Sequence, residues 1–277
     1  MIVGIAGLGL IGGSFAKAYS EAGWTVLGYD TDRQILDFAA LSGAVNGELG
    51  AENIGSCDLV LVCTYPGAAV EWTRSMASHI GSKPVVIDCC GTKRMVCEKL
   101  FALAKEYGFT YLGGHPMAGT QYSGFKYSKA NLFKGQPMVI VPGDFNDIGL
   151  LGRVRDLLEP AGFGKLSVST AAEHDEMIAF TSQLAHVVSN VYIKSRTAEK
   201  HKGFSAGSYK DMTRVAWLHP RMWAELFIEN KDCLLAEIDC FSENLAQTRQ
   251  AIADGDMERL TALLDEGRRR KAEIDGR

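Results

Sequence analysis

Short apolar runs alternate with segments of helical periodicity through the first part of the chain. Runs of strand composition occur at 2–6, 25–29, 58–64, 84–88, 136–141 and 165–168. Helical spacing of apolar residues occurs between them, for example at 10–22 and 33–41. Since 58–64 is apolar almost throughout, it resembles a central strand covered on both faces. The alternation predicts an α/β Rossmann-type domain with a mainly parallel sheet over residues 1–169.

The pattern changes at Thr170, where Thr170 and Glu173 have the spacing of a capping box. No glycine follows until Gly203 and no proline until Pro220, which predicts a helix of about thirty residues. Later apolar stripes comprise Leu234, Ile238, Phe241 and Leu245, and then Leu260, Leu263 and Leu264. Such stripes indicate core or subunit interface. We therefore expect residues 170–277 to form an all-helical substrate and dimerisation domain, and the protein to be a homodimer.

The first strand-to-helix corner carries three glycines at the spacing of a dinucleotide-binding loop. Gly7 suits the tight turn, Gly9 lets the backbone approach a pyrophosphate, and Gly12 lets the helix pack closely on the strand. Leu10 and Ile11 would present unpaired N–H groups to the anion at the helix N-terminus. A structural glycine turn is the alternative.

An acid after the second strand strengthens the cofactor interpretation. Asp30 follows the run 25–29, about 20 residues beyond the motif, where a carboxylate binds the ribose hydroxyls. Because Asp30 would repel a 2′-phosphate, the sequence favours NAD over NADP. Arg33 argues against this preference, since a guanidinium at that position could hold the phosphate.

Composition narrows the class of protein. The chain has 277 residues, a net charge of −4 and a pI near 5.9, so no basic surface for nucleic acid is expected. Its apolar runs are too short to span a bilayer, so no membrane association is expected. The seven cysteines show no paired CxxC spacing, which argues against a zinc or other metal site. With no secretion signal at the start, we expect reduced thiols and a cytoplasmic enzyme.

Three segments at strand ends carry candidate chemistry. Thr64 ends the run 58–64 before Tyr65-Pro66-Gly67, a loop expected to border the cofactor, with a plain turn as the alternative. The neighbouring Cys89 and Cys90 would point to opposite faces of an extended strand, which favours structural thiols over a disulfide. His115 follows a strand, enclosed by glycine and proline, where an imidazole could accept a proton. A turn histidine bonded to backbone is its alternative role.

The helical part offers further polar candidates. His186 lies in the apolar part of the long helix with Ser182 and Asn190 one turn away, and could be either a ligand or a hydrogen-bonded core histidine. Arg214 precedes Val215-Ala216, and its guanidinium would suit a carboxylate if it borders a pocket rather than solvent. No role is expected for His79, His174, His201 or His219.

The order of these features resembles the prephenate dehydrogenase family over nearly the whole chain. The matching stretches are the glycine motif with Asp30, the strand ending at Asp88 with its loop, Gly-His-Pro-Met-Ala-Gly-Thr at 114–120, and Lys-Asp-Met-Thr-Arg-Val-Ala at 210–216. The resemblance implies a nucleotide-binding domain followed by a helical domain that dimerises. It also implies NAD-dependent oxidative decarboxylation of prephenate to 4-hydroxyphenylpyruvate, in tyrosine biosynthesis.

The resemblance also implies roles for individual residues. His115 would take the hydroxyl proton, His186 would line the substrate pocket, and Arg214 would hold a substrate carboxylate. Further substrate-binding positions are Thr120, Gln121, Gly207 and Trp223. Because Gln121 is neutral, prephenate is expected in preference to arogenate, whose side chain carries an ammonium group.

Departures from the family pattern leave some questions open. Gly91 stands where many members have a serine that orients the histidine and nicotinamide, so that task is expected to pass to Thr92 or water. Gln183 and Ala185 replace a histidine and a proline of the family's Ser-His-Leu-Pro-His pattern. The alternatives are an arogenate dehydrogenase, a 3-hydroxy acid dehydrogenase of similar build, and a nucleotide sensor without turnover. The 3-hydroxy acid enzymes place a lysine on the long helix, where this chain has His186 instead. A sensor would not need His115, His186 and Arg214 together.

Overall fold

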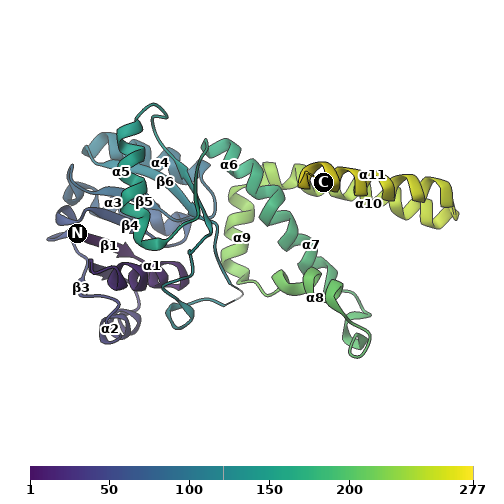
Figure 1. Cartoon of the computed structure of the whole chain (residues 1–277), viewed down its shortest axis with the longest axis horizontal. Helices are drawn as coiled ribbons and strands as arrows, with labels where there is room; N and C mark the ends of the chain where they lie inside the picture. The colour runs from purple at the N-terminus through teal and green to yellow at the C-terminus, as the bar shows by residue number, and fades with distance from the viewer. Residues whose placement is uncertain (121, 277) are drawn as a thin grey trace. The chain divides into compact units, whose positions relative to one another are not determined.

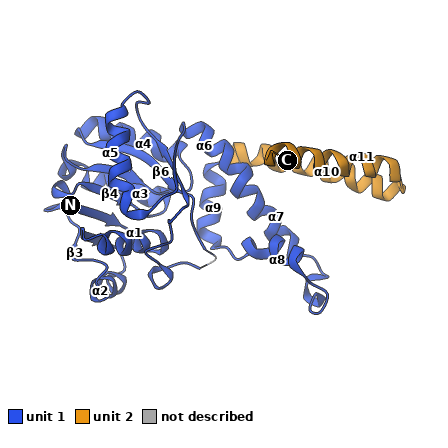
Figure 2. Cartoon of the chain, in the orientation of Figure 1, with its two compact units in different colours: residues 1–230 blue, residues 231–277 orange. Residues whose placement is uncertain are grey.

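A computed structural model describes residues 1–120 and 122–276. The chain divides into two compact units, residues 1–230 and 231–277 (Figure 2). The expected domain boundary between residues 169 and 170 lies inside the first unit, where the helices that follow it contact the sheet domain. That boundary stays a prediction.

The described residues of the first unit form an eight-stranded sheet in the order β3-β2-β1-β4-β5-β6-β7-β8 (Figure 1). The strands are β1 (Ile2–Ala6), β2 (Thr25–Tyr29), β3 (Gly47–Glu48), β4 (Leu59–Val62), β5 (Val85–Asp88), β6 (Thr110–Pro116), β7 (Pro137–Val141) and β8 (Lys165–Val168). All neighbouring strands pair in parallel except β6 and β7. The expected Rossmann-type fold is therefore confirmed. The two-residue β3 is too short to have produced a hydrophobic pattern.

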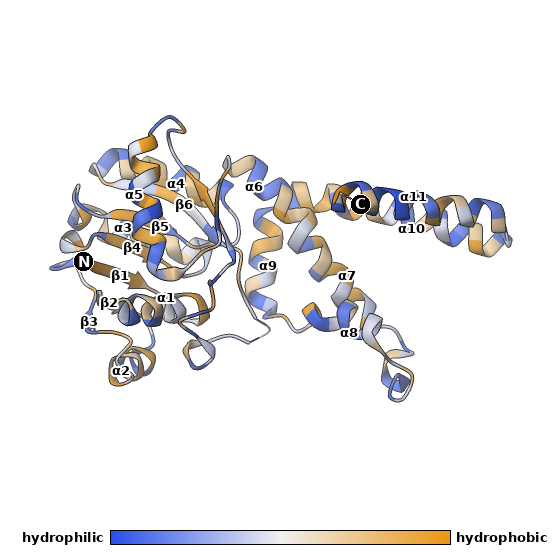
Figure 3. Ribbon diagram, viewed as in Figure 1, coloured by the Kyte–Doolittle hydropathy of each residue, from blue (hydrophilic) through white to orange (hydrophobic). Residues whose placement is uncertain are grey.

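Helices cover both faces of the sheet, because neighbouring strand residues point to opposite sides. Leu59 and Leu61 enter one buried cluster, and Val60 and Val62 enter the other. The helices are α1 (Leu10–Glu21), α2 (Arg33–Leu41) and α5 (Ile148–Leu158) on the first side, and α3 (Pro66–Ile80) and α4 (Arg94–Tyr107) on the second. Strand β1, which pairs with β4, is coloured as hydrophobic in Figure 3.

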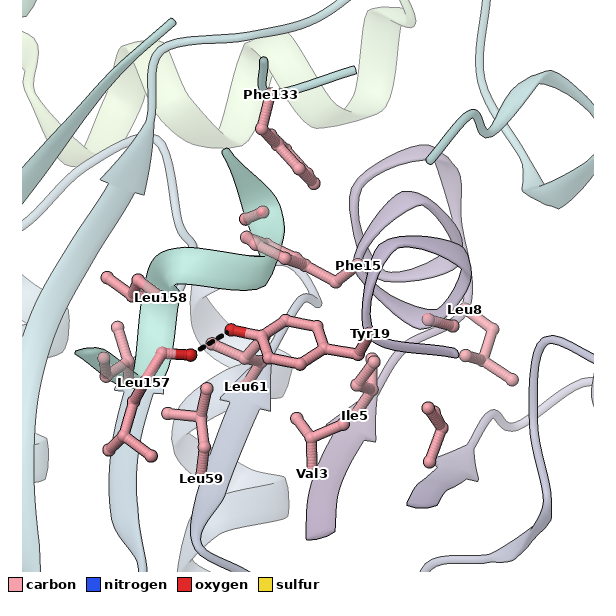
Figure 4. Close-up of a cluster of buried hydrophobic side chains, with 14 of the residues drawn as sticks. Val3, Ile5, Leu8, Phe15, Tyr19, Leu59, Leu61, Phe133, Leu157 and Leu158 are labelled. Atoms are coloured by element: carbon pink, nitrogen blue, oxygen red, sulfur yellow. Dashed lines mark hydrogen bonds between the residues drawn. The ribbon is translucent and has the colours of Figure 1, made fainter. Parts of the chain in front are cut away.

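Tyr19 shows how a polar atom is accommodated in the first cluster (Figure 4). Its ring is fully buried, and its hydroxyl donates a 2.7 Å hydrogen bond to the Leu157 carbonyl oxygen. Because a buried hydroxyl without a partner is costly, this bond fixes where α5 lies against α1.

His115 lies within β6 rather than on a loop after the strand, which corrects the expectation from the sequence. β6 pairs with β5 as far as Leu112 and continues past it, where Gly113 to Pro116 pair antiparallel with β7. The close approach explains the glycines: a Cβ on Gly114 would lie 2.6 Å from the Asp88 carbonyl oxygen. The sequence concealed this extension because the Gly113-Gly114 pair is typical of a turn.

Three helical segments follow β8 without a break: α6 (Ala171–Ile178), a π-helical stretch η4 (Ala179–Leu184) and α7 (Ala185–Tyr192). The expected helix of about thirty residues is therefore too long, since α7 ends at Tyr192. Beyond it the Ser195 hydroxyl oxygen accepts a hydrogen bond from the Thr197 N–H. Such local side-chain bonds compete with helix continuation.

The rest of the first unit is short helices. They are α8 (Gly207–Thr213), η6 (Arg214–Ala216) and α9 (Pro220–Glu229), with further 3₁₀ turns η1 (Ile54–Ser56), η2 (Phe125–Tyr127), η3 (Glu159–Ala161) and η5 (Ala198–Lys200). Pro220 occupies the first turn of α9, where its missing N–H costs nothing, and the His219 side chain caps that end by accepting from the Met222 N–H.

The second unit consists of α10 (Lys231–Asp254) and α11 (Met257–Asp275), which lie side by side (Figure 2). Gly255 turns the chain between them at φ +66°, and Asp256 caps α11 by accepting from the Arg259 N–H. Apolar side chains of both helices are exposed in the single chain, including Phe241, Leu245 and Leu264. Nowhere in the described ranges is a helix both long and apolar enough to cross a membrane.

Gly12 offers a test of the packing between α1 and β1. A Cβ at this position would lie 1.8 Å from the Gly7 carbonyl oxygen, so Gly12→Ala forces backbone to move. We expect a loss of about 1–3 kcal/mol in the free energy of unfolding, seen as a lower midpoint of thermal unfolding. Gly152→Ala in α5 is the control, since no described atom lies within 4 Å of its Cβ position and alanine favours a helix. Unchanged midpoints for Gly12→Ala would contradict the close packing.

Candidate active site

The glycine loop joins β1 to α1 at the carboxyl edge of the sheet. Gly7 has φ +88°, and a Cβ there would lie 2.7 Å from both the Cys63 carbonyl oxygen and the Thr64 side chain. Gly9, by contrast, has no described atom within 4 Å of its Cβ position. No side chain among the described residues caps α1 at Gly9, so the first-turn N–H groups remain for a ligand. Thr64 lies against this loop, and its contact with a cofactor stays a prediction.

Asp30 holds the glycine loop and follows β2 directly. One carboxylate oxygen accepts from the Leu8 N–H at 2.7 Å, and the other accepts from the Asp32 N–H at 2.9 Å. Each oxygen has a second lone pair, which fits the hydroxyls of a ribose. The Arg33 guanidinium, which could otherwise hold a 2′-phosphate, pairs with Glu48 at 2.7 Å and with Asp37 at 3.0 Å. These residues fit an NAD-type dinucleotide.

His115 contacts a second histidine. Its Nδ1 lies 2.8 Å from Nε2 of His174, which stands in the first turn of α6. Burial lowers the pKa of His115 well below its ordinary value of 6.5, and it is lowered further by His174, where that ring is protonated, and by the Lys93 charge. A neutral imidazole at this position is suited to accept a proton near neutral pH.

His174 in turn contacts Asp175, with 2.8 Å between its Nδ1 and the carboxylate Oδ1. Both side chains are buried. The sequence predicts no role for His174, so its contacts with His115 and Asp175 correct that expectation. Two signals were available: the capping box at Thr170 and Glu173 sets the position of the first turn, and a histidine beside an acid follows at once.

A buried ion pair supports the end of β6. The Lys93 ammonium contacts the Asp88 carboxylate and donates a 2.6 Å hydrogen bond to the Gly114 carbonyl oxygen. Asp88 also accepts from the Tyr111 hydroxyl at 2.7 Å. Burial lowers the pKa of Lys93, but the Asp88 charge and hydrogen bond, together with Cys90 and Cys97, outweigh it, so the net pKa is raised and the lysine stays charged.

Helix α9 lies over the loop that follows β5. A Cβ on Gly91 would lie 3.2 Å from the Leu226 side chain, so a serine here would crowd that leucine. The Thr92 hydroxyl donates to the Glu229 carboxylate at 2.6 Å and is therefore engaged away from His115. The Gln183 amide donates to the Leu226 carbonyl oxygen at 3.0 Å, which ties η4 to the same helix. The sequence predicts that Thr92 or water takes over from the missing serine, but the described hydrogen bond of the His115 ring is to His174.

His186 and Trp223 form a stacked pair that comes from α7 and α9. Their ring centroids are 3.7 Å apart with 28° between the planes. His186 Nδ1 donates to the Ser182 carbonyl oxygen at 2.8 Å, which leaves the lone pair on Nε2. Burial lowers the pKa of His186, and the nearby positive charge of Arg214 lowers it further. The structure thus brings these three candidates together, with the guanidinium of Arg214 exposed.

The remaining candidates are placed as follows. Thr120 is exposed, and its hydroxyl exchanges hydrogen bonds with the Tyr122 backbone. Gly207 begins α8, with no described atom within 4 Å of its Cβ position. Gln121 lies outside the described residues.

A Rossmann-type sheet with a dinucleotide loop and a neutral histidine at the same edge defines an NAD-dependent oxidoreductase. Comparison with protein families agrees: residues 15–166 match the nucleotide-binding domain of prephenate dehydrogenase, and residues 170–266 match its dimerisation domain. The chain therefore belongs to the prephenate dehydrogenase family.

Individual relatives agree with this assignment. A cyclohexadienyl dehydrogenase of Zymomonas mobilis is 32% identical over 92% of this chain and 90% of its own. A prephenate dehydrogenase of Bacillus subtilis is 27% identical over 92% of this chain and 71% of its own. Among solved structures, the A. aeolicus prephenate dehydrogenase with hydroxyphenyl propionate and NAD⁺ has a TM-score of 0.83 at 26% identity, over 99% of this chain and 98% of that one. The Synechocystis arogenate dehydrogenase, at 23% identity and a TM-score of 0.81, over 99% of this chain and 100% of that one, shows the same fold.

Proposed function

We propose that this protein is a prephenate dehydrogenase that oxidises and decarboxylates prephenate to 4-hydroxyphenylpyruvate with NAD, in tyrosine biosynthesis. The observation that carries the proposal is the neutral His115, backed by His174 and placed at the edge of the sheet that holds the glycine loop. Relatives described as prephenate and cyclohexadienyl dehydrogenases support the same substrate class.

The residues divide the reaction between them. Bound NAD supplies the acceptor for the hydride that leaves the hydroxyl-bearing ring carbon. His115 takes the hydroxyl proton as a carbonyl forms at that carbon. The ring carboxylate departs as CO₂, and its bonding electrons complete the aromatic ring. The ring oxygen takes back a proton from His115, so that a phenol results. Arg214 holds a substrate carboxylate, while His186 presents Nε2 from a ring held flat against Trp223.

Cofactor choice follows from the second strand. Asp30 is held beside the glycine loop by a hydrogen bond from the Leu8 N–H, and its charge would repel a 2′-phosphate. Arg33, which could attract that phosphate, is paired with Glu48 and Asp37. Both features favour NAD over NADP.

The helical region is proposed to pair two copies of the chain. The matched family domain over 170–266 is described as a dimerisation domain, and α10 and α11 expose apolar side chains that a second copy would cover. A solution mass of twice the 30.1 kDa chain supports this assembly, and a mass of one chain rejects it.

Substrate and cofactor preference test the proposal directly. The neutral Gln121 leaves no carboxylate to pair with the ammonium of arogenate, so catalytic efficiency should be higher for prephenate. The measurement is reduced-cofactor absorbance with prephenate or arogenate and with NAD or NADP. Gln121→Glu should shift the preference toward arogenate. Faster arogenate turnover in the unmodified protein would reject the substrate assignment, and equal efficiency with both cofactors would reject the role of Asp30.

His115→Asn should lower kcat by roughly 10²–10⁴-fold, because the general base is removed. In the unmodified enzyme, the pKa of His115 lies well below 6.5, so its ring is neutral at pH 6.5 and above. We therefore expect kcat/KM to stay level from about pH 8 to 6.5 and to fall only at lower pH. The KM for NAD should hardly change. His79→Asn, at an exposed histidine late in α3, is the matched control. A loss below about threefold in His115→Asn would remove His115 from the mechanism.

Arg214→Gln should raise the KM for prephenate by about ten- to a hundredfold, since hydrogen bonds to a charged group are worth about 1.5–3 kcal/mol. Arg214→Lys should recover only part of the binding, because the ammonium lacks the planar fork. Arg155→Gln, an exposed residue of α5, serves as the control. The assignment fails if Arg214→Gln binds prephenate as well as the unmodified enzyme does.

A further inference from the structure

We propose that His174, held by Asp175, is a positioning residue that fixes the His115 ring with its proton on Nδ1 and its lone pair on Nε2. The inference rests on the proposed role of His115 as the proton acceptor. It concerns the step before reaction, when only one of the two neutral forms of His115 can receive a proton at Nε2.

Asp175 sets the direction of the hydrogen bonds. Its carboxylate accepts from the backbone N–H groups of Lys93 at 2.7 Å and Arg94 at 2.9 Å, and from the Arg94 side chain at 3.3 Å. Burial raises the pKa of Asp175, but the bonds from His174, Arg94 and Lys93 outweigh it and the net pKa is lowered. An ionised carboxylate is acceptor-only, so the nitrogen that faces it, His174 Nδ1, carries the proton.

The proton on His174 Nδ1 then decides the state of His115. Burial lowers the pKa of His174, so its ring is neutral and its Nε2 bears a lone pair. That lone pair lies 2.8 Å from His115 Nδ1. Two nitrogen lone pairs at this distance would repel, so His115 Nδ1 donates its N–H. The second nitrogen of the neutral His115 ring, Nε2, is left free to accept the substrate proton.

The charged groups around the pair favour this arrangement. Burial is the main cause that lowers the pKa of both histidines, and Lys93 lowers it further, whereas Asp175 and Asp88 only partly offset this for His174. Both rings are therefore neutral before reaction. When His115 takes a proton on Nε2, its Nδ1–H remains bonded to His174, with the Asp175 charge behind it to stabilise the cation.

The arrangement is consistent with a glycine at position 91, where many family members have a serine. A Cβ at position 91 would lie 3.2 Å from the Leu226 side chain, which would have to shift, and the Thr92 hydroxyl is bonded to Glu229. Among the described contacts of His115, the hydrogen bond to His174 orients its ring.

A pair of variants separates positioning from packing. His174→Leu fills much of the space but offers no acceptor, whereas His174→Gln places an amide oxygen near the position of Nε2. We expect kcat to fall by about 10–100-fold in His174→Leu and to stay within about threefold of the unmodified enzyme in His174→Gln. The KM for NAD should not change in either variant. His79→Leu provides the control for replacing an exposed histidine.

A spectroscopic measurement reads the proton position directly. In full-length protein labelled with ¹⁵N-histidine, the His115 signals are identified by their loss in His115→Asn. We expect the unmodified protein to show His115 protonated at Nδ1, and His174→Leu to shift the ring toward the Nε2-protonated form. The spectrum of the unmodified protein decides the question even if His174→Leu does not fold.

The outcomes distinguish this inference from the proposed function. An Nε2-protonated His115 in the unmodified protein, or equal loss of kcat in His174→Leu and His174→Gln, would overturn the positioning role while leaving His115 as the base. Full activity in His115→Asn would instead overturn the proposed function itself.

Discussion

The site depends on the buried ion pair between Asp88 and Lys93. Neither side chain is exposed to solvent, so each charge needs the other, and removing one partner of such a pair typically costs about 3–5 kcal/mol. The lysine also binds the Gly114 carbonyl oxygen, which fixes the backbone immediately before His115. The pair thus joins the end of β5, the start of α4 and the end of β6 in one arrangement.

The loop between β5 and α4 also contacts α6, the first helix after the sheet. The backbone N–H groups of Lys93 and Arg94 both donate to the Asp175 carboxylate. The carboxylate that orients His174 is therefore held by the lysine of the ion pair and by the residue that follows it. Asn230 extends this network: its amide nitrogen donates to the Asp175 backbone carbonyl and to the Gln183 side-chain oxygen, both at 2.8 Å, and its side-chain oxygen accepts from Arg94. Buried polar groups that all have partners make a rigid support. This rigidity is what a proton acceptor of fixed orientation requires.

The departures from the family pattern have local physical reasons. Gly91 leaves room for Leu226, and Gln183 uses both ends of its amide, donating to Leu226 and accepting from Asn230. Hydrogen bonds to α9 thus hold η4, the π-helical stretch that leads into His186. A π-helical turn changes which face the following residues present, which is a common feature of functional sites.

The sequence by itself determined the Rossmann-type sheet, the glycine loop and Asp30, because these follow from periodicity and from local backbone requirements at Gly7 and Gly12. It also indicated His115, His186 and Arg214 as candidates through the family's motifs. Only the tertiary structure decided that His115 lies inside β6, that the helix after Thr170 ends at Tyr192, and that His174 meets His115. Those outcomes depend on contacts between residues far apart in the chain, such as Gly114 with Asp88 and His115 with His174, for which no local pattern exists.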